Sequence, residues 1–184
     1  MLRFFTKKKP NPAVESLYNA AVAQARRPIF YQTFGVPDTL EGRFDMVIFH
    51  IWPLIDTLRD DNGGISPDGQ ALFDHYVHDM EQNLRAIGIS DSSFPKKMKA
   101  VGKAFYGRFN AYRNAVGDND ALATAIARNV LGDEGLAGTP WAQALAGYGA
   151  AMRSAAAQAQ NVLDRFDYPD PLPFEPDNTA AVAS

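Results

Sequence analysis

RRPIFYQTFGVPDTLEGRFD, residues 26–45, is the segment of this chain that sets how its helices are laid out. It places two prolines, two glycines, aromatic side chains and opposed charges between segments with ordinary helical patterns. A connection of this length is uncommon between packed helices, and it is usually either functional or disordered. Phe30, Tyr31 and Phe34 argue against disorder, because disordered segments are poor in aromatic side chains. We therefore expect a long ordered loop between the first two helices.

Helical patterns occur on both sides of this loop, and strand patterns do not. Apolar residues recur at spacings of three and four. Asn11, Ser66 and Thr139, each followed by proline, mark helix starts, and Gly88 ends a helix as a left-handed cap. We expect helices at residues 11–27, 38–58, 66–87, 95–116, 119–131 and 139–166. The chain shows no internal repeat and no domain linker. The sequence therefore predicts an all-α, single-domain bundle of about six helices.

The second expected helix, residues 38–58, has three features of its own. Asp38 and Glu41 fit a capping box, in which the Asp38 carboxylate accepts a backbone amide and Glu41 reaches back. Its apolar residues form a single face toward the core. Pro53 lacks an amide hydrogen, so we expect it to kink or split the helix.

Composition restricts the classes of protein to consider. With 184 residues and 46% hydrophobic side chains, one domain can bury a core without disulfides or metals. The absence of cysteine excludes disulfides, thiolate metal sites and cysteine nucleophiles. A net charge of −3 gives the whole protein no reason to bind nucleic acid, so we expect no sequence-specific binding of DNA or RNA.

We divide the chain into a leader at residues 1–10, a helical domain at 11–167 and a proline-rich tail at 168–184 that becomes disordered. The leader is basic and aromatic through Arg3, Phe4, Phe5, Lys7, Lys8 and Lys9. It is either a solvated terminus or a contact for an anionic surface, which would be a membrane or the RNA of a ribosome. It lacks the apolar core of a signal peptide, and no run is long enough to span a membrane. We therefore expect a soluble protein inside the cell.

Histidines are the residues that come nearest to suggesting a metal or haem site. His75 and His78 lie three apart with acidic neighbours, but they fall largely opposite the apolar face of their helix, which favours a solvated pair. His50 lies on an apolar helix and must either find a partner in the core or line a binding pocket. We expect no bound metal or cofactor. The alternative is a helical bundle that handles haem or metal through these histidines.

Catalytic motifs are absent, since the sequence has no nucleophile elbow, phosphate loop, dinucleotide fingerprint or zinc spacing. We therefore expect a binding protein and not an enzyme. Tyr31, Asp38, Arg43 and His50 could line a groove that grips a partner helix. In the simpler interpretation, Asp38, Arg43 and Asp45 only provide a helix cap and a salt bridge that fixes the loop against the bundle.

Five motifs, in order along the chain, resemble those of the ubiquinol-cytochrome c chaperone family, which includes mitochondrial assembly factors for cytochrome b and their bacterial relatives. They are PIFY at 28–31, VPDTLEGRFD at 36–45 with His50 after it, DMEQNLRAIGISD at 79–91, AFYGRFNAY at 104–112 and ARN at 127–129. The resemblance extends over residues 17–131 and is far more specific than any single short motif.

The resemblance implies an assembly chaperone that binds newly made cytochrome b and supports formation of the cytochrome bc1 complex, with no cofactor. It also implies a bacterial member on the cytoplasmic side of the inner membrane, peripherally bound to it, since no long targeting leader is present. The candidate client-binding residues lie in the matching segments: Phe30, Tyr31, Asp38, Arg43, Asp45, His50, Arg85, Tyr106, Arg108 and Tyr112. For Arg85, Tyr106 and Arg108, the alternative is that they only tie helices together.

Overall fold

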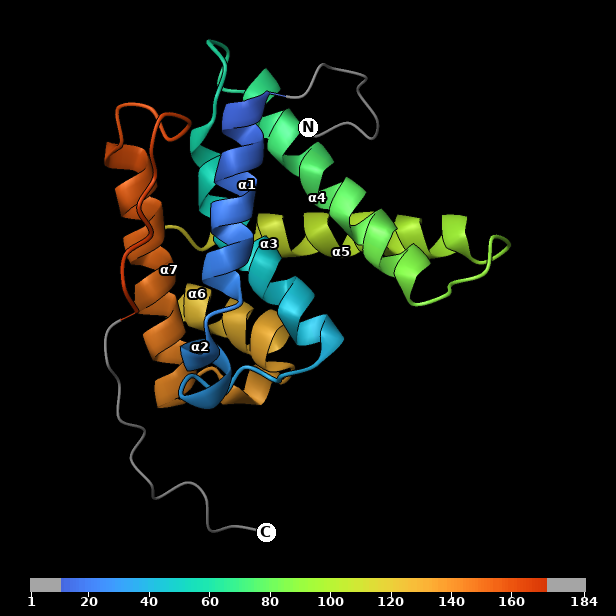
Figure 1. The fold of residues 1–184 in the computed structure, drawn as a ribbon. Coiled ribbons are helices and arrows are strands. Elements are labelled where there is room, and N and C mark those ends of the chain that lie inside the picture. The colour runs from blue at the N-terminus through green and yellow to red at the C-terminus, as the bar shows by residue number, and fades with distance from the viewer. Residues whose placement is uncertain (1–10, 172–184) are drawn as a thin grey trace, which may run out of the picture.

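The computed structural model describes residues 11–171, which form helices joined by loops (Figure 1). The α-helices are α1 (Pro12–Ala25), α2 (Pro28–Gln32), α3 (Leu40–Thr57), α4 (Pro67–Ala86), α5 (Phe94–Asn114), α6 (Asn119–Ile126) and α7 (Pro140–Gln158). A π-helical turn, η1 (Ala127–Leu131), extends α6, and a 3-10 turn, η2 (Glu134–Leu136), precedes α7. The predicted all-α, single-domain fold is confirmed. The predicted leader and residues 172–184 of the predicted tail lie outside the described residues.

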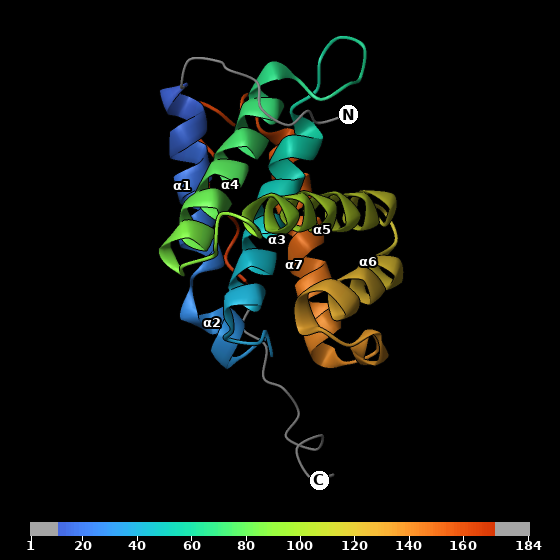
Figure 2. The ribbon, with the colours of Figure 1, turned by 90° about the vertical axis from the view of Figure 1, so that its right-hand side faces the viewer.

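Helix α3 runs through the middle of the bundle, and α1, α4, α5 and α7 pack around it (Figure 1, Figure 2). Every residue from Met46 to Asp56 is buried. We predicted a single apolar face for this helix, and that prediction is wrong. Other helices cover it on all sides, and a helix in such a position is apolar around its whole circumference. The first turn is the exception, since Leu40 remains 41% exposed.

The stretch at residues 26–45 is ordered, as predicted, but it is not all loop. Pro28 ends α1 and also opens the short helix α2, at a position where a missing amide hydrogen removes no helical bond. Phe30 and Phe34 are buried, with ring centroids 5.8 Å apart. Gly35 has a φ of +70° and lies against the ring of Trp141, so the turn that follows α2 requires a glycine.

The capping residue of α3 is Thr39 and not Asp38, which corrects our prediction. Thr39 Oγ1 accepts a hydrogen bond from the Gly42 amide at 3.0 Å. Because the helix begins at Leu40, the side chain placed to reach that amide belongs to Thr39. The Asp38 carboxylate lies instead 2.7 Å from Arg43 Nε.

Pro53 lies inside α3, and the helix continues past it to Thr57 as one element. The helix is therefore not split, and a kink at Pro53 stays a prediction. Pro53 and its neighbours are buried, so packing on all sides holds the helix where proline removes a backbone hydrogen bond. The Thr57 hydroxyl lies 3.0 Å from the carbonyl oxygens of both Pro53 and Leu54.

The predicted helices at residues 11–27, 66–87, 95–116 and 119–131 correspond to α1, α4, α5 and α6 with η1. Asn11, Ser66 and Thr139 each accept a backbone amide at the start of a helix, as their positions predicted. Gly88 has a φ of +79°, which confirms its prediction as the left-handed residue that stops α4.

The last helix is shorter than predicted, because α7 ends at Gln158. The side chain of Asn161 accepts a hydrogen bond from the Leu163 amide, and such a bond favours a turn over further helix. The chain then runs back along α7 (Figure 1). Tyr168 packs into the bundle, so residues 168–171, which we assigned to the tail, lie against the folded domain.

Helices α3 and α7 approach each other closely at Gly149. A β-carbon at this position would lie 3.0 Å from the Phe49 ring, which is fully buried. Gly147, on the same helix, has open space around the corresponding position. This pair of glycines therefore separates the effect of packing from that of helix propensity.

We predict opposite effects for alanine at these two glycines. Gly149→Ala should lower the free energy of unfolding by about 1–3 kcal/mol, because the buried Phe49 ring has little room to move. Gly147→Ala should raise it by about 0.5–1 kcal/mol, because alanine is the better helix former. Denaturant titration of both variants measures the difference. Equal effects would show that α3 and α7 are not in close contact at Gly149.

Candidate functional site

His50 lies in a chain of hydrogen bonds inside the bundle. Its Nδ1 is 2.8 Å from the Met46 carbonyl oxygen, and its Nε2 is 3.1 Å from the Tyr148 hydroxyl. Gln24 donates to the same hydroxyl at 2.9 Å. Since a carbonyl can only accept, Nδ1 carries the proton and Nε2 accepts from Tyr148. Both nitrogens of the imidazole are therefore satisfied.

Aromatic rings enclose this imidazole. The ring centroids of Phe30, Phe49, Tyr148 and Tyr168 lie between 5.1 and 5.6 Å from that of His50. Burial lowers the pKa of His50 to about 4, because the charged imidazole would lose its hydration there. His50 is thus a neutral core residue, and it does not line a groove.

The other two histidines do not join His50 in a ligand set. His75 is half-buried and stacks on Tyr18 with centroids 6.0 Å apart, so it is less solvated than we expected. His78 is exposed, as expected. Within residues 11–171, no three His, Cys, Asp or Glu side chains are grouped so that they could hold a metal ion. No geometry in this part of the chain favours the haem or metal alternative.

Tyr31, Asp38 and Arg43 do come together, at the surface. Arg43 pairs with Asp38 at 2.7 Å, and its guanidinium carbon lies 5.9 Å from the centre of the Tyr31 ring. The hydrogen bond from Arg43 lowers the pKa of Asp38. With Arg26 and Pro28 they line a pocket of about 150 Å³, which suits one side chain and not a helix about 10 Å across. Contact of this pocket with a client stays a prediction.

The other predicted client-binding residues are spread over the bundle. Arg108 Nε lies 2.8 Å from Asp45 Oδ1, and both side chains are largely buried. Burial raises the pKa of Asp45 to about 6, and Arg108 opposes the rise, so the pair is charged at neutral pH. Arg85 covers the Phe94 ring at 4.2 Å on another side of the bundle. Three of the predicted residues are core residues that cannot reach a client while the bundle is closed: Phe30, His50 and Tyr112.

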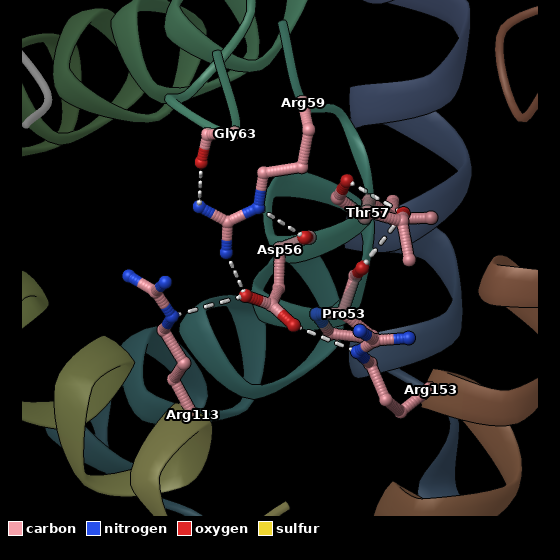
Figure 3. Close-up of polar contacts among 8 residues, drawn as sticks. Pro53, Asp56, Thr57, Arg59, Gly63, Arg113 and Arg153 are labelled. Atoms are coloured by element: carbon pink, nitrogen blue, oxygen red, sulfur yellow. Dashed lines mark hydrogen bonds and ion pairs between the residues drawn. The ribbon is translucent and has the colours of Figure 1, made fainter. Parts of the chain in front are cut away.

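A charged cluster that we did not predict from the sequence surrounds Asp56, in the last turn of α3 (Figure 3). Asp56 is 5% exposed. Arg153 Nε is 2.7 Å from its Oδ2, and Arg113 Nε is 3.5 Å from its Oδ1. Arg59 also bonds to Oδ1 and donates to the Asp56 carbonyl at 2.8 Å. The cluster thereby joins the C-terminal parts of α3, α5 and α7.

The Asp56 cluster lines a hollow of about 720 Å³. A second hollow, of about 460 Å³, shares Arg59, Gly63 and Arg113 with it. A third, of about 240 Å³, shares Val116 and Arg153 with it. Because neighbouring hollows share lining residues, the three lie side by side, and we call them together the arginine groove. Tyr106 lines the second hollow and is the one predicted client-binding residue that lies in this groove.

The lining of the arginine groove carries more positive than negative charge. Its charged side chains are three arginines and one carboxylate, that of Asp56. A concave surface with an excess of one charge concentrates its electrostatic potential. Guanidinium groups in such a place are suited to bind carboxylates or phosphates. The groove can therefore hold an anionic group, and it offers no set of side chains for a chemical reaction.

Comparison with known proteins agrees with the motifs. The family model described as ubiquinol-cytochrome C chaperone matches residues 32–165. The ubiquinol-cytochrome-c reductase complex assembly factor 1 of Xenopus laevis is 24% identical over 132 residues, which are 69% of this chain and 64% of that protein. The chain thus spans less than two thirds of the length of that relative. The crystal structure of the Cbp3 homolog from Brucella abortus matches with a TM-score of 0.76 and 32% identity, over 86% of this chain and 90% of that one.

We predict that His50 remains neutral, with its proton on Nδ1, when the pH falls from about 7 to about 5. The ordinary pKa of histidine, about 6.5, would make most of the imidazole charged at the lower pH. Nitrogen-15 spectra of the imidazole ring at the two pH values distinguish the neutral tautomer from the charged form. Protonation of His50 near its ordinary pKa in the folded protein would contradict the buried hydrogen-bond chain.

Proposed function

Because the chain belongs to the ubiquinol-cytochrome c chaperone family, we propose that it assists assembly of the ubiquinol-cytochrome c reductase complex. The family membership confirms the resemblance drawn from the motifs. The observation that carries the proposal is the family match over residues 32–165, which covers most of the folded domain. The Xenopus laevis relative, named as an assembly factor of that complex, supports it. For a member of a chaperone family, we propose binding, and not catalysis, as the function.

We propose that the client is newly made cytochrome b. A membrane protein that waits for its cofactors and partner subunits exposes polar and unpacked surfaces that later become buried. A protein that binds this form in preference to the assembled form stabilises it by mass action. The arginine groove suits such a client, because charged side chains stand beside apolar ones such as Val116, which is 47% exposed.

We also propose that the protein works at the surface of a membrane, on its cytoplasmic side. Among the helices that the structure describes, none is both long and apolar enough to cross a bilayer. The first half of α5 carries four exposed lysines: Lys96, Lys97, Lys99 and Lys103. Each cation close to an anionic membrane contributes about 1 kcal/mol of attraction. The basic leader would add to this attraction.

Deletion of the gene tests the proposed function. Cells without the protein should lose the assembled ubiquinol-cytochrome c reductase complex, as measured on native gels and by the reductase activity of membranes. A tagged copy should restore the complex and should co-purify with cytochrome b, identified by mass spectrometry. An unrelated respiratory complex on the same gels is the control. A normal amount of assembled reductase in the deletion strain would contradict the proposal.

Flotation with lipid vesicles tests the membrane proposal. The full chain should float with anionic vesicles at low salt and not with neutral vesicles. Replacement of Lys96, Lys99 and Lys103 by glutamine should reduce the floated fraction, and removal of residues 1–10 should reduce it further. Circular dichroism should show unchanged helix content in each variant. If both variants float as the wild type does, neither basic region is a membrane contact.

A further inference from the structure

We propose that the arginine groove is a docking site for an acidic segment of a protein partner, which carries carboxylates to Arg113 and Arg153. The inference rests on the proposed function, since an assembly factor must hold protein partners, and it adds a location and a chemistry for one of them. The groove lies over the C-terminal end of α3, away from the pocket formed by Tyr31, Asp38 and Arg43.

Arg113 and Arg153 can each bind a second anion while they remain paired with Asp56. Arg153 and Arg113 both face the carboxylate through Nε. Figure 3 shows the terminal nitrogens of Arg113 turned away from Asp56, and the terminal nitrogens of neither arginine make a hydrogen bond to another residue of the described chain. The terminal nitrogens form the fork that binds carboxylates in bidentate fashion. Asp56 therefore orients both forks without occupying them.

Arg59 differs from the other two arginines. Its Nε donates to the Asp56 carbonyl, one terminal nitrogen bonds to the Asp56 carboxylate, and the other lies 3.4 Å from the Gly63 carbonyl. All three of its nitrogens are thus engaged within the protein. Arg59 has a structural role, and the binding capacity of the groove lies in Arg113 and Arg153.

The positions of these two arginines favour a peptide segment over a single small anion. Arg113 lines both the first and the second hollow, whereas Arg153 lines the first and the third. Arg113 and Arg153 approach the Asp56 carboxylate from opposite sides in Figure 3, so their guanidinium groups do not converge on one point. Two separate carboxylates on one segment match this arrangement, and a lone phosphate does not.

The walls between the two forks supply apolar contact. Val116 is 47% exposed and lines the first and third hollows. Ala156 and Ala157 line the first hollow from α7. The nearby loop carboxylate of Asp60 is turned into its own loop, where it accepts the Gly64 amide at 2.8 Å. The expected segment therefore combines acidic residues with small apolar ones.

Arg113 is the residue with which to test the site. It is 48% exposed and lies 3.5 Å from the buried Asp56 carboxylate, which keeps Arg59 and Arg153 as partners when Arg113 is replaced. Arg128 is a matched control, since it is 53% exposed and lies 3.5 Å from Glu134, outside the arginine groove. Arg113→Gln and Arg128→Gln remove the same charge from similarly exposed guanidinium groups, although the Asp56 carboxylate is 5% exposed and the Glu134 carboxylate is 59% exposed. Thermal melting of both variants shows whether the fold is retained.

The probe is an array of overlapping peptides that cover the subunits of the reductase complex from the same organism. Tagged full-length protein should bind acidic peptides, and replacement of their Asp and Glu by Asn and Gln should abolish binding. Arg113→Gln should weaken this binding by about tenfold, which corresponds to the loss of a charge-assisted pair, whereas Arg128→Gln should leave it unchanged. Arg113→Lys, which keeps the charge but loses the fork, should also weaken it.

The same variants in the deletion strain separate this inference from the proposed function. Arg113→Gln should lower the amount of assembled reductase, and Arg128→Gln should restore it fully. If no acidic peptide in the array shows binding that depends on Arg113, the proposed docking site is wrong. If the deletion strain nevertheless lacks the reductase, the proposed function stands and only the site is wrong.

Discussion

The structure depends on the burial of α3 on all sides. In a helix enclosed by α1, α4, α5 and α7, a polar group without a partner costs free energy, and among the side chains of α3 Trp52 Nε1 is left without one. His50 and Asp56 are the buried polar and charged residues of the described chain, and both belong to this helix. Other residues supply their partners. The Tyr148 hydroxyl bonds to His50 Nε2, the Tyr168 hydroxyl donates to the His50 carbonyl oxygen, and three arginines form ion pairs with Asp56.

The two residues are satisfied in different ways, and the difference separates scaffold from candidate site. The hydrogen bonds of His50 end within the bundle, at the Met46 carbonyl and at the half-buried side chain of Gln24. Asp56 lies where α3 reaches the edge of the bundle, and its arginines extend from its carboxylate into open hollows. One buried carboxylate thus fixes guanidinium groups whose binding atoms face outward. On this account, the Asp56 carboxylate needs ion-pair partners inside the fold, and the arginines that pair with it are thereby oriented to bind a partner protein.

Much of the fold could be predicted from local sequence, whereas the candidate site could not. Asn11, Ser66 and Thr139 mark helix starts, because capping involves neighbouring residues only. Asp56 and Arg153 are 97 positions apart, so their contact exists only once α3 and α7 have packed. A carboxylate at the end of the most apolar run was the one available signal. Pairs of close residues such as Asp38 and Arg43 were found because their proximity is visible in sequence, and proximity alone does not indicate a binding site.

Hydrogen exchange of the tagged protein, measured alone and in the assembly complex recovered from cells, tests the central claim most directly. The account predicts that the partner slows exchange in the segments that line the arginine groove, at residues 56–65, 106–117 and 150–162. It also predicts little change at residues 28–43, which contain the small pocket of Tyr31, Asp38 and Arg43. Protection confined to residues 28–43, with unchanged exchange around the groove, would contradict it.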